Sequence, residues 1–212
     1  MVKLGIIGSG NGSNFQAILE AINHGRLKAQ IACVLSDNSN AHILFRAKTY
    51  GIPAIYIDCS PFRTKLDGRG EEEVIRIMQE YDVHYIILAG FMRMIKTGLL
   101  SAFPSKIINI HPSLLPAFPG LASWKQALEY GVKWTGCTVH FVDSGMDTGP
   151  IIVQRVVPVM DADTPDTLHA RIQQQEHIAY PEALDLLLSG KAILDGRLVR
   201  IAATSKSSVS KC

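Results

Sequence analysis

The residues best suited to chemistry lie in one short segment, residues 107–112, which reads Ile-Ile-Asn-Ile-His-Pro. Its β-branched residues predict a buried strand, and Pro112 ends that strand because proline cannot donate to a sheet ladder. Side chains alternate along a strand, so Asn109 and His111 face the same side. Ligands of open α/β sheets bind at the carboxyl ends of the strands. The segment therefore predicts a site that combines an amide with an imidazole.

A carboxylate is expected to join this pair. Asp147 lies in the Gly- and Pro-containing loop 145–150, after a second β-like segment, residues 137–142. If the two strand ends are adjacent, this carboxylate would hold His111 protonated or orient its ring. Taken alone, Asn109 would merely close a strand and His111 would be a hydrogen-bonded core histidine. Three such groups at strand ends favour acyl-group chemistry over that alternative.

A glycine-rich turn separates the first predicted strand from the first predicted helix. Residues 8–14 read Gly-Ser-Gly-Asn-Gly-Ser-Asn, and residues 15–22 have helical spacing. Glycines let the backbone approach a ligand closely, and the free N–H groups of a helix start bind anions. Ser13 stands where the dinucleotide fingerprint requires its third glycine. A single phosphate held by Gly12, Ser13 and Asn14 fits better than a pyrophosphate, and a turn that binds no ligand is the alternative.

The order of apolar runs and amphipathic segments indicates the fold. Five or six β-α units follow one another, which predicts an α/β protein with a doubly wound, mostly parallel sheet and antiparallel additions near the C-terminus. The predicted strands are residues 2–7, 30–35, 52–57, 85–90, 107–111, 137–142 and 151–156. The predicted helices are residues 15–22, 41–50, 71–81, 97–103, 122–130 and 165–188, the last interrupted at Pro181. A hairpin over 191–201 completes one domain, residues 1–201, and residues 202–212 are expected to form a disordered tail.

Composition and charge disfavour several classes of protein. With 212 residues and 47% hydrophobic content, the chain is long enough for one sizeable core. The net charge is +2 and no stripe of Lys and Arg occurs, so we expect no nucleic-acid surface. The 4 cysteines are scattered, which favours reduced thiols. Neither a signal peptide nor a run of about 18 apolar residues is present, so we expect a cytoplasmic protein without a membrane span.

Five motifs occur in a fixed order along the chain. They are Gly10-Asn11-Gly12-Ser13-Asn14, Leu88-Ala89-Gly90-Phe91-Met92-Arg93, Asn109-Ile110-His111-Pro112-Ser113-Leu114-Leu115-Pro116, Asp147-Thr148-Gly149-Pro150 and Gln175-Glu176-His177. Over residues 1–190 the chain resembles the phosphoribosylglycinamide formyltransferases. The resemblance implies transfer of a formyl group from 10-formyltetrahydrofolate, a co-substrate, to the amine of glycinamide ribonucleotide in de novo purine biosynthesis.

The resemblance also implies roles for individual residues. Gly12, Ser13 and Asn14 would hold the phosphate of the acceptor. Glu176 would meet its ribose, with Gln173 nearby. The folate would be held by Met92, Arg93, Met94, Ile95, Asn109, the loop from Asp143 to Asp147, and a basic residue that is either Arg63 or Lys65.

The implied reaction gives catalytic roles to Asn109, His111 and Asp147. Asn109 would donate an amide N–H to the oxyanion of the tetrahedral intermediate, a contact worth about 3 kcal/mol. His111 would share that role as an imidazolium and then act as general acid, which contributes about 10²–10⁴-fold. Asp147 would hold His111 charged and organise a water that relays the proton. No nucleophile adjoins His111 and no histidines have metal-ligand spacing, so we predict direct transfer without a covalent intermediate or a metal.

Several alternatives remain open. Methionyl-tRNA formyltransferase would need a C-terminal nucleic-acid-binding domain, and formyltetrahydrofolate hydrolase an N-terminal regulatory domain. A nucleotide-binding module that lost catalysis would not need Asn109, His111 and Asp147, and a nicotinamide oxidoreductase is weakened by Ser13. Where the family often carries a His, this chain has Leu121. We expect small-molecule partners and a monomer or homodimer.

Overall fold

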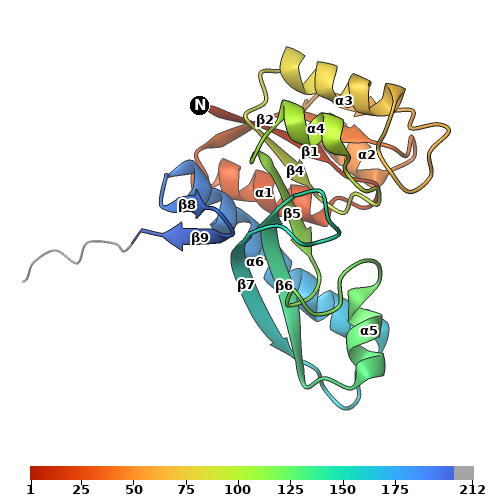
Figure 1. Ribbon diagram of the computed structural model, residues 1–212, viewed down its shortest axis with the longest axis vertical. Coiled ribbons are helices and arrows are strands. Elements are labelled where there is room, and N and C mark those ends of the chain that lie inside the picture. The colour runs from red at the N-terminus through yellow and green to blue at the C-terminus, as the bar shows by residue number, and fades with distance from the viewer. Residues whose placement is uncertain (203–212) are drawn as a thin grey trace, which may run out of the picture.

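The computed structural model describes residues 1–202 and shows a seven-stranded sheet with helices on both faces (Figure 1). The strands of this sheet are β1 (Val2–Ile7), β2 (Ala29–Ser36), β3 (Ala54–Tyr56), β4 (Tyr85–Leu88), β5 (Ile107–His111), β6 (Trp134–Phe141) and β7 (Ile151–Pro158). The helices are α1 (Ser13–Asn23), α2 (His42–Thr49), α3 (Arg69–Glu80), α4 (Thr97–Ala102), α5 (Ser123–Tyr130) and α6 (Pro165–Leu188). The strands β8 (Ala192–Asp195) and β9 (Leu198–Ile201) form the expected hairpin. Of the predicted tail, all residues beyond Ala202 lie outside the described part of the chain.

The strand order of the sheet is β3-β2-β1-β4-β5-β6-β7. The first five strands are parallel, whereas β6 and β7 are antiparallel to their neighbours. This arrangement confirms the predicted fold class. In Figure 1 the antiparallel pair extends with α5 away from the parallel strands. The strand order reverses between β1 and β4, and the loops that follow these two strands therefore leave the sheet in a region suited to ligand binding.

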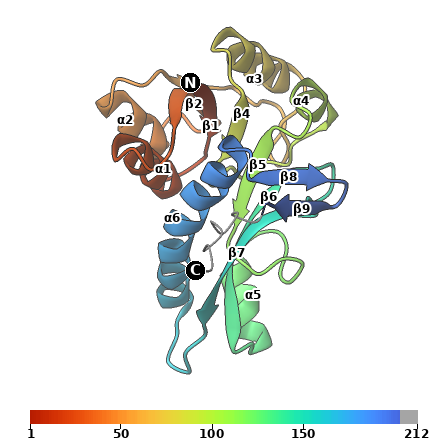
Figure 2. The ribbon, with the colours of Figure 1, turned by 90° about the vertical axis from the view of Figure 1, so that its left-hand side faces the viewer.

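Each face of the sheet has its own hydrophobic core, because apolar side chains alternate along the strands. Residues of α1, α2 and α6 pack on one face, and residues of α3 and α4 pack on the other (Figure 2). In β5, Ile108 and Ile110 face the first core and Ile107 faces the second. Asn109 and His111 therefore share the face of Ile107. None of the helices within residues 1–202 is long and apolar enough to cross a membrane.

The prediction that Pro181 interrupts the last helix was wrong. The helix α6 runs without a break from Pro165 to Leu188 and includes Pro181. A proline inside a helix removes one backbone hydrogen bond, here the bond to the carbonyl of His177. Burial of Tyr180, Pro181 and Leu184 against the sheet holds the helix together across this position. Tertiary packing thus outweighs the local preference of proline.

The side chain of Tyr180 joins α6 to the two central strands. Its hydroxyl lies 2.9 Å from the carbonyl oxygen of Leu88, at the end of β4, and 2.9 Å from that of Ile108 in β5. The ring is fully buried, and burial raises the pKa of the phenol well above its usual value, so the hydroxyl remains a donor. Because Ile108 precedes Asn109, this contact fixes the backbone beside the predicted site.

We expect Tyr180→Phe to lower the free energy of unfolding by about 1–3 kcal/mol, because two buried carbonyl groups lose their shared donor. Urea denaturation followed by circular dichroism measures this change. Tyr81→Phe, at a half-buried residue just after α3, serves as the control and should stay within about 0.5 kcal/mol of the wild type. Equal stability of Tyr180→Phe and the wild type would contradict the bridging role.

Candidate active site

The structure places Asn109 and His111 side by side at the carboxyl end of β5. Across the antiparallel pair, Asn109 lies opposite His140 and His111 lies opposite Thr138. His111 is only 4% exposed, whereas the side chain of Asn109 is half-buried. The pair therefore combines a sheltered imidazole with an amide that is accessible to a ligand.

His111 is held between a carboxylate and a carbonyl group. Its Nδ1 lies 3.3 Å from Oδ2 of Asp147, and its Nε2 lies 2.8 Å from the carbonyl oxygen of Phe118. A neutral imidazole has one N–H group, so one of its nitrogens would turn a lone pair toward an acceptor. Only the doubly protonated ring can satisfy both neighbours. Asp147 and Phe118 thus hold the ring from both sides.

The loop after β5 encloses His111 and Asp147 from one side. Phe118 and Gly120 have left-handed backbone angles, with φ of 53° and 83°. These turns aim the Phe118 carbonyl at His111, while the backbone N–H of Gly120 donates to Oδ2 of Asp147 over 2.8 Å. A Cβ on Gly120 would also approach Sδ of Met146 to 3.2 Å. The loop thus contacts both His111 and Asp147, and Nε2 of His111 can donate to a ligand only when its hydrogen bond to the carbonyl of Phe118 is broken.

His140 is a site residue that the sequence did not single out. Its Nδ1 lies 2.8 Å from the carbonyl oxygen of Phe141, which fixes the proton on Nδ1 because a carbonyl accepts only. Its Nε2 then accepts from the amide of Asn109 over 3.2 Å. Burial lowers the pKa of His140 and outweighs the opposing effects of Phe141 and Asp147, so the ring is neutral near pH 7. The 3.8 Å approach of Asp147 to Nε2 is therefore no ion pair.

The orientation of the Asn109 amide follows from this tautomer. One N–H of its NH₂ group donates to His140, which turns the nitrogen side of the amide toward the site. The second N–H is left to donate to a ligand, as an oxyanion stabiliser requires. Only the register of β5 against β6 could have pointed to His140 from the sequence.

The predicted phosphate loop lies at the start of α1. Gly12 has a φ of 76°, and a Cβ there would lie 2.7 Å from Cγ1 of Ile43, so only glycine fits. The helix begins at Ser13, and its first N–H groups have no intrahelical acceptor. Arg46 of α2 donates from Nε to the carbonyl oxygen of Asn11 over 2.9 Å, which fixes the loop against α2.

Arg46 was not predicted as a site residue. It lines a surface pocket of about 310 Å³, and Ser13 and Gln16 of α1 line the same pocket. Arg26 and His177 supply further nitrogen groups, and Glu20 is the one carboxylate among the lining residues. The pocket therefore favours an anion beside the phosphate loop.

A buried carboxylate lies behind this loop. Glu176 of α6 is 5% exposed, and its Oε2 accepts from Nδ2 of Asn14 over 2.8 Å. Burial raises the pKa of Glu176, and the hydrogen bond from Asn14 opposes that shift. Gln173, one turn earlier in α6, is half-buried. The Asn14–Glu176 contact joins the predicted phosphate and ribose sites.

The predicted folate-binding segment 92–95 follows β4 and is hydrogen-bonded to the loop 60–68. The backbone N–H of Met94 donates to Thr64, and that of Leu66 donates to Met94, both over 2.9 Å. Met92 is 60% exposed and Met94 is partly exposed, so both can meet a ligand. The side chain of Ile95 is 5% exposed and packs in the second core.

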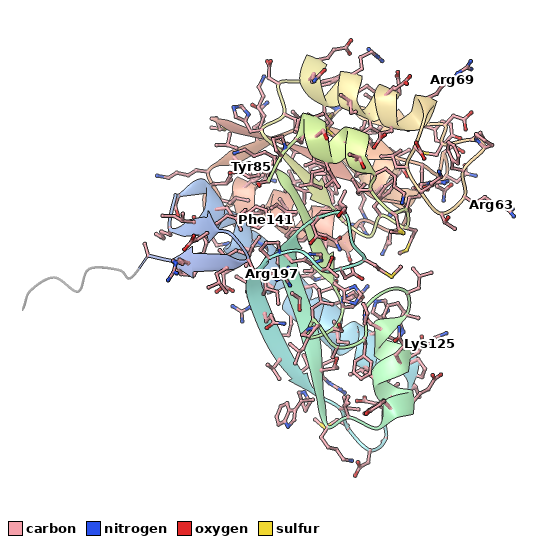
Figure 3. The ribbon with its side chains drawn as sticks, viewed as in Figure 1. Arg63, Arg69, Tyr85, Lys125, Phe141 and Arg197 are labelled. Atoms are coloured by element: carbon pink, nitrogen blue, oxygen red, sulfur yellow. The ribbon has the colours of Figure 1, made fainter. Side chains whose placement is uncertain are left out.

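The charged residues predicted near the folate have partners within the protein. Arg93 donates from Nε to Oδ2 of Asp37 over 2.6 Å and from a second nitrogen to the carbonyl of Phe62. Nζ of Lys65 lies 2.5 Å from Oδ2 of Asp67. Arg63 is exposed and points away from the body of the protein in Figure 3. The side chains of Arg93 and Lys65 thus stabilise loops, which their residue types alone could not reveal.

The remaining predicted residue, Asp143, begins the loop that carries Asp147. Its Oδ1 accepts from Oγ1 of Thr148 over 2.6 Å, which closes the loop on itself. Within residues 1–202, no three His, Cys, Asp or Glu side chains gather closely enough to hold a metal ion.

Comparison with known proteins identifies the family of this chain. The profile of the formyl transferase family matches residues 2–184, and the chain belongs to this family. The chain is 42% identical over 188 residues to "Phosphoribosylglycinamide formyltransferase" of Bacillus subtilis (strain 168), covering 89% of this chain and 95% of that protein. The protein of the same name from Escherichia coli (strain K12) is 39% identical over 183 residues, with 86% and 85% covered. The resemblance stated from the sequence is thereby confirmed, as is the predicted class of enzyme.

Solved structures agree with this assignment. "Glycinamide ribonucleotide transformylase 1" from Symbiobacterium toebii superposes with a TM-score of 0.90 at 45% identity, covering 95% of this chain and 94% of that chain. A formyltetrahydrofolate deformylase from Pseudomonas syringae has a TM-score of 0.87 at 25% identity. The match covers 94% of this chain but only 65% of that chain.

The protonation of His140 predicts a dependence of stability on pH. Because burial lowers its pKa in the folded state below the ordinary histidine value of about 6.5, the unfolded state binds a proton first as the pH falls. The contribution of His140 to the free energy of unfolding is therefore fully present above about pH 6.5 and is lost as the pH falls below that value. The loss is at most about 1.4 kcal/mol for each pH unit that separates the unfolded pKa from the folded pKa. Urea denaturation at pH 7.5 and 5.5 should show a smaller loss in His140→Asn than in the wild type.

The other histidines remain in both proteins, so their contributions cancel in this comparison. Among them, His169 and His177 also have a lowered pKa because they are partly buried. Identical losses in the wild type and in His140→Asn would show that His140 is not held neutral.

Proposed function

We propose that this protein transfers a formyl group from 10-formyltetrahydrofolate to the amine of glycinamide ribonucleotide, a step of purine biosynthesis. The observation that carries the proposal is the cluster of Asn109, His111 and Asp147 at the end of β5, with the amide of Asn109 oriented by His140. The names of the relatives in Bacillus subtilis and Escherichia coli support it.

The acceptor would bind between α1 and α6. Its phosphate would accept hydrogen bonds from the backbone around Gly12, Ser13 and Asn14, where the positive end of the helix dipole favours an anion. The guanidinium of Arg46 would add a positive charge. Glu176 would accept a hydrogen bond from a ribose hydroxyl, and Gln173 would contribute a contact nearby.

The folate would lie on the side of the loops after β4 and β6. The exposed Met92 and Met94 offer apolar contacts to a flat ring, and the backbone of residues 92–95 offers hydrogen bonds. The loop that begins at Asp143 would form the facing wall. Arg63 is exposed and would meet the anionic tail. The residues present therefore suit a ligand with an aromatic head and a charged tail.

The chemistry requires a stabilised oxyanion and a proton transfer. As the acceptor nitrogen bonds to the formyl carbon, the free N–H of Asn109 donates to the oxygen that gains negative charge. His111, as an imidazolium, adds positive charge beside it. The proton lost by the attacking nitrogen passes through a water held by Asp147 to the folate nitrogen, whose bond to the formyl carbon then breaks. No covalent bond to the protein is needed.

We further propose that the protein works in the cytoplasm on small molecules as a monomer or homodimer, without nucleic-acid or membrane partners. The weak net charge of +2 supports the absence of a nucleic-acid surface.

The test is spectrophotometric, with 10-formyl-5,8-dideazafolate as formyl donor in the presence and absence of glycinamide ribonucleotide. We expect deformylation that requires the ribonucleotide. In Asn109→Ala, kcat should fall about 10²–10³-fold because the oxyanion loses its donor. Asn23→Ala, at the far end of α1, is the control and should turn over like the wild type.

A formyltetrahydrofolate hydrolase is the second candidate, favoured by the likeness to the deformylase from Pseudomonas syringae. Release of deformylated folate at the same rate without acceptor would establish that activity and overturn the transferase.

Arg46→Met should raise KM for glycinamide ribonucleotide about 10–100-fold and leave kcat unchanged, because a charge-assisted contact to phosphate is worth about 1.5–3 kcal/mol. Steady-state kinetics at saturating folate measure both constants. Lys48→Met removes an exposed positive charge from the same helix and should leave KM unchanged. If both variants had the same KM, Arg46 would play no part in binding the phosphate.

A further inference from the structure

The loop between β6 and β7 holds Asp147 in an unfavourable backbone conformation. Asp147 has a φ of 55°, in the left-handed region that non-glycine residues rarely adopt. Such a conformation persists only where surrounding contacts impose it. Within the loop, Oδ1 of Asp143 accepts from the backbone of Gly145 over 3.1 Å and from Oγ1 of Thr148 over 2.6 Å. These bonds fix the loop's shape but not its position relative to His111.

The C-terminal hairpin supplies a contact from outside the loop. Arg197 lies in the turn between β8 and β9, and its guanidinium donates a hydrogen bond to the carbonyl oxygen of Thr148. Thr148 is the neighbour of Asp147 in the chain. Phe141 is the last residue of β6, where this loop begins. The backbone N–H of Phe141 bonds to Pro150 over 2.9 Å, so this is the base of the same loop.

The hairpin that carries Arg197 is packed against the body of the protein. Leu194 and Val199 face each other across it and pack against the first hydrophobic core. Ala192 is 8% exposed, and the backbone N–H of Ala202 bonds to Lys191 over 2.7 Å, which closes the base of the hairpin. The hairpin lies beyond residues 2–184, the part of the chain that matches the family profile.

We infer that Arg197 is a positioning residue: through the carbonyl of Thr148, it restrains the loop 143–149 and so holds the carboxylate of Asp147 against His111. Without Arg197, the loop would depend on its internal bonds, on the bond from Gly120 and on the contact of Asp147 with His111 itself. The effect of Arg197 on turnover rests on the proposed function, whereas its effect on the loop does not.

The restraint is measured by hydrogen–deuterium exchange of the full chain without ligands. In Arg197→Met, the amides of residues 143–149 should exchange about fivefold faster, as expected for the loss of one hydrogen bond. Arg200→Met is the matched control, since Arg200 is an exposed arginine of the same hairpin that pairs with Asp195 over 2.7 Å. It should leave exchange in the loop unchanged. Equal exchange in Arg197→Met and the wild type, or equal acceleration by both variants, would overturn the inference.

Kinetics separate positioning from a merely structural role. We expect kcat of Arg197→Met to fall about three- to fivefold, with KM for glycinamide ribonucleotide unchanged because Arg197 does not line the pocket beside the phosphate loop. Arg197→Lys retains a donor and should recover part of the loss. Faster exchange with unchanged kcat would overturn the positioning role. If the wild type lacked transferase activity, the proposed function would be wrong. The hydrogen–deuterium exchange of residues 143–149 would then test by itself whether Arg197 restrains the loop.

Discussion

The site depends on the antiparallel pairing of β6 with β5. A parallel strand at that place would need a crossover connection and would run in the same direction as β5. The antiparallel strand instead sets His140 directly across from Asn109, where its neutral ring fixes the amide. Because Phe141 pairs with Ile108, the loop after β6 leaves the sheet toward the amino end of β5 and turns back to bring Asp147 within 3.3 Å of His111. A parallel sheet with one reversed pair therefore brings an amide, two imidazoles and a carboxylate together.

Several charged side chains that could bind ligands are used to hold loops. Arg93 joins the loops after β2 and β4 through Asp37 and also binds the carbonyl of Phe62. Lys65 is paired with Asp67 in the same region. These contacts fix the edge of the sheet on the proposed folate side and leave methionine side chains and backbone groups exposed there. Recognition on that side would rest on shape and apolar contact more than on charge.

The sequence predicts what depends on local pattern and misses what depends on distant pairing. Strand alternation and the rule for strand ends suffice to put Asn109 and His111 on one face. The role of His140 required the register of two strands, which periodicity does not contain. The partner of Arg93 lies 56 residues away, so its residue type could not separate a ligand contact from an ion pair. The prediction that Pro181 interrupts the last helix was wrong because burial of its neighbours outweighs the tendency of proline to break a helix.

The hydrogen bond between Asn14 and Glu176 spans 162 positions of the chain. A nascent chain leaving the ribosome exposes Asn14 among its first residues, but Glu176 follows only when nearly all of the protein has been made. The proposed acceptor pocket can therefore close only after synthesis of α6, and contacts this distant in sequence form late because loop closure must come first. An incomplete chain, even one with β5 and its histidine in place, could not form this contact.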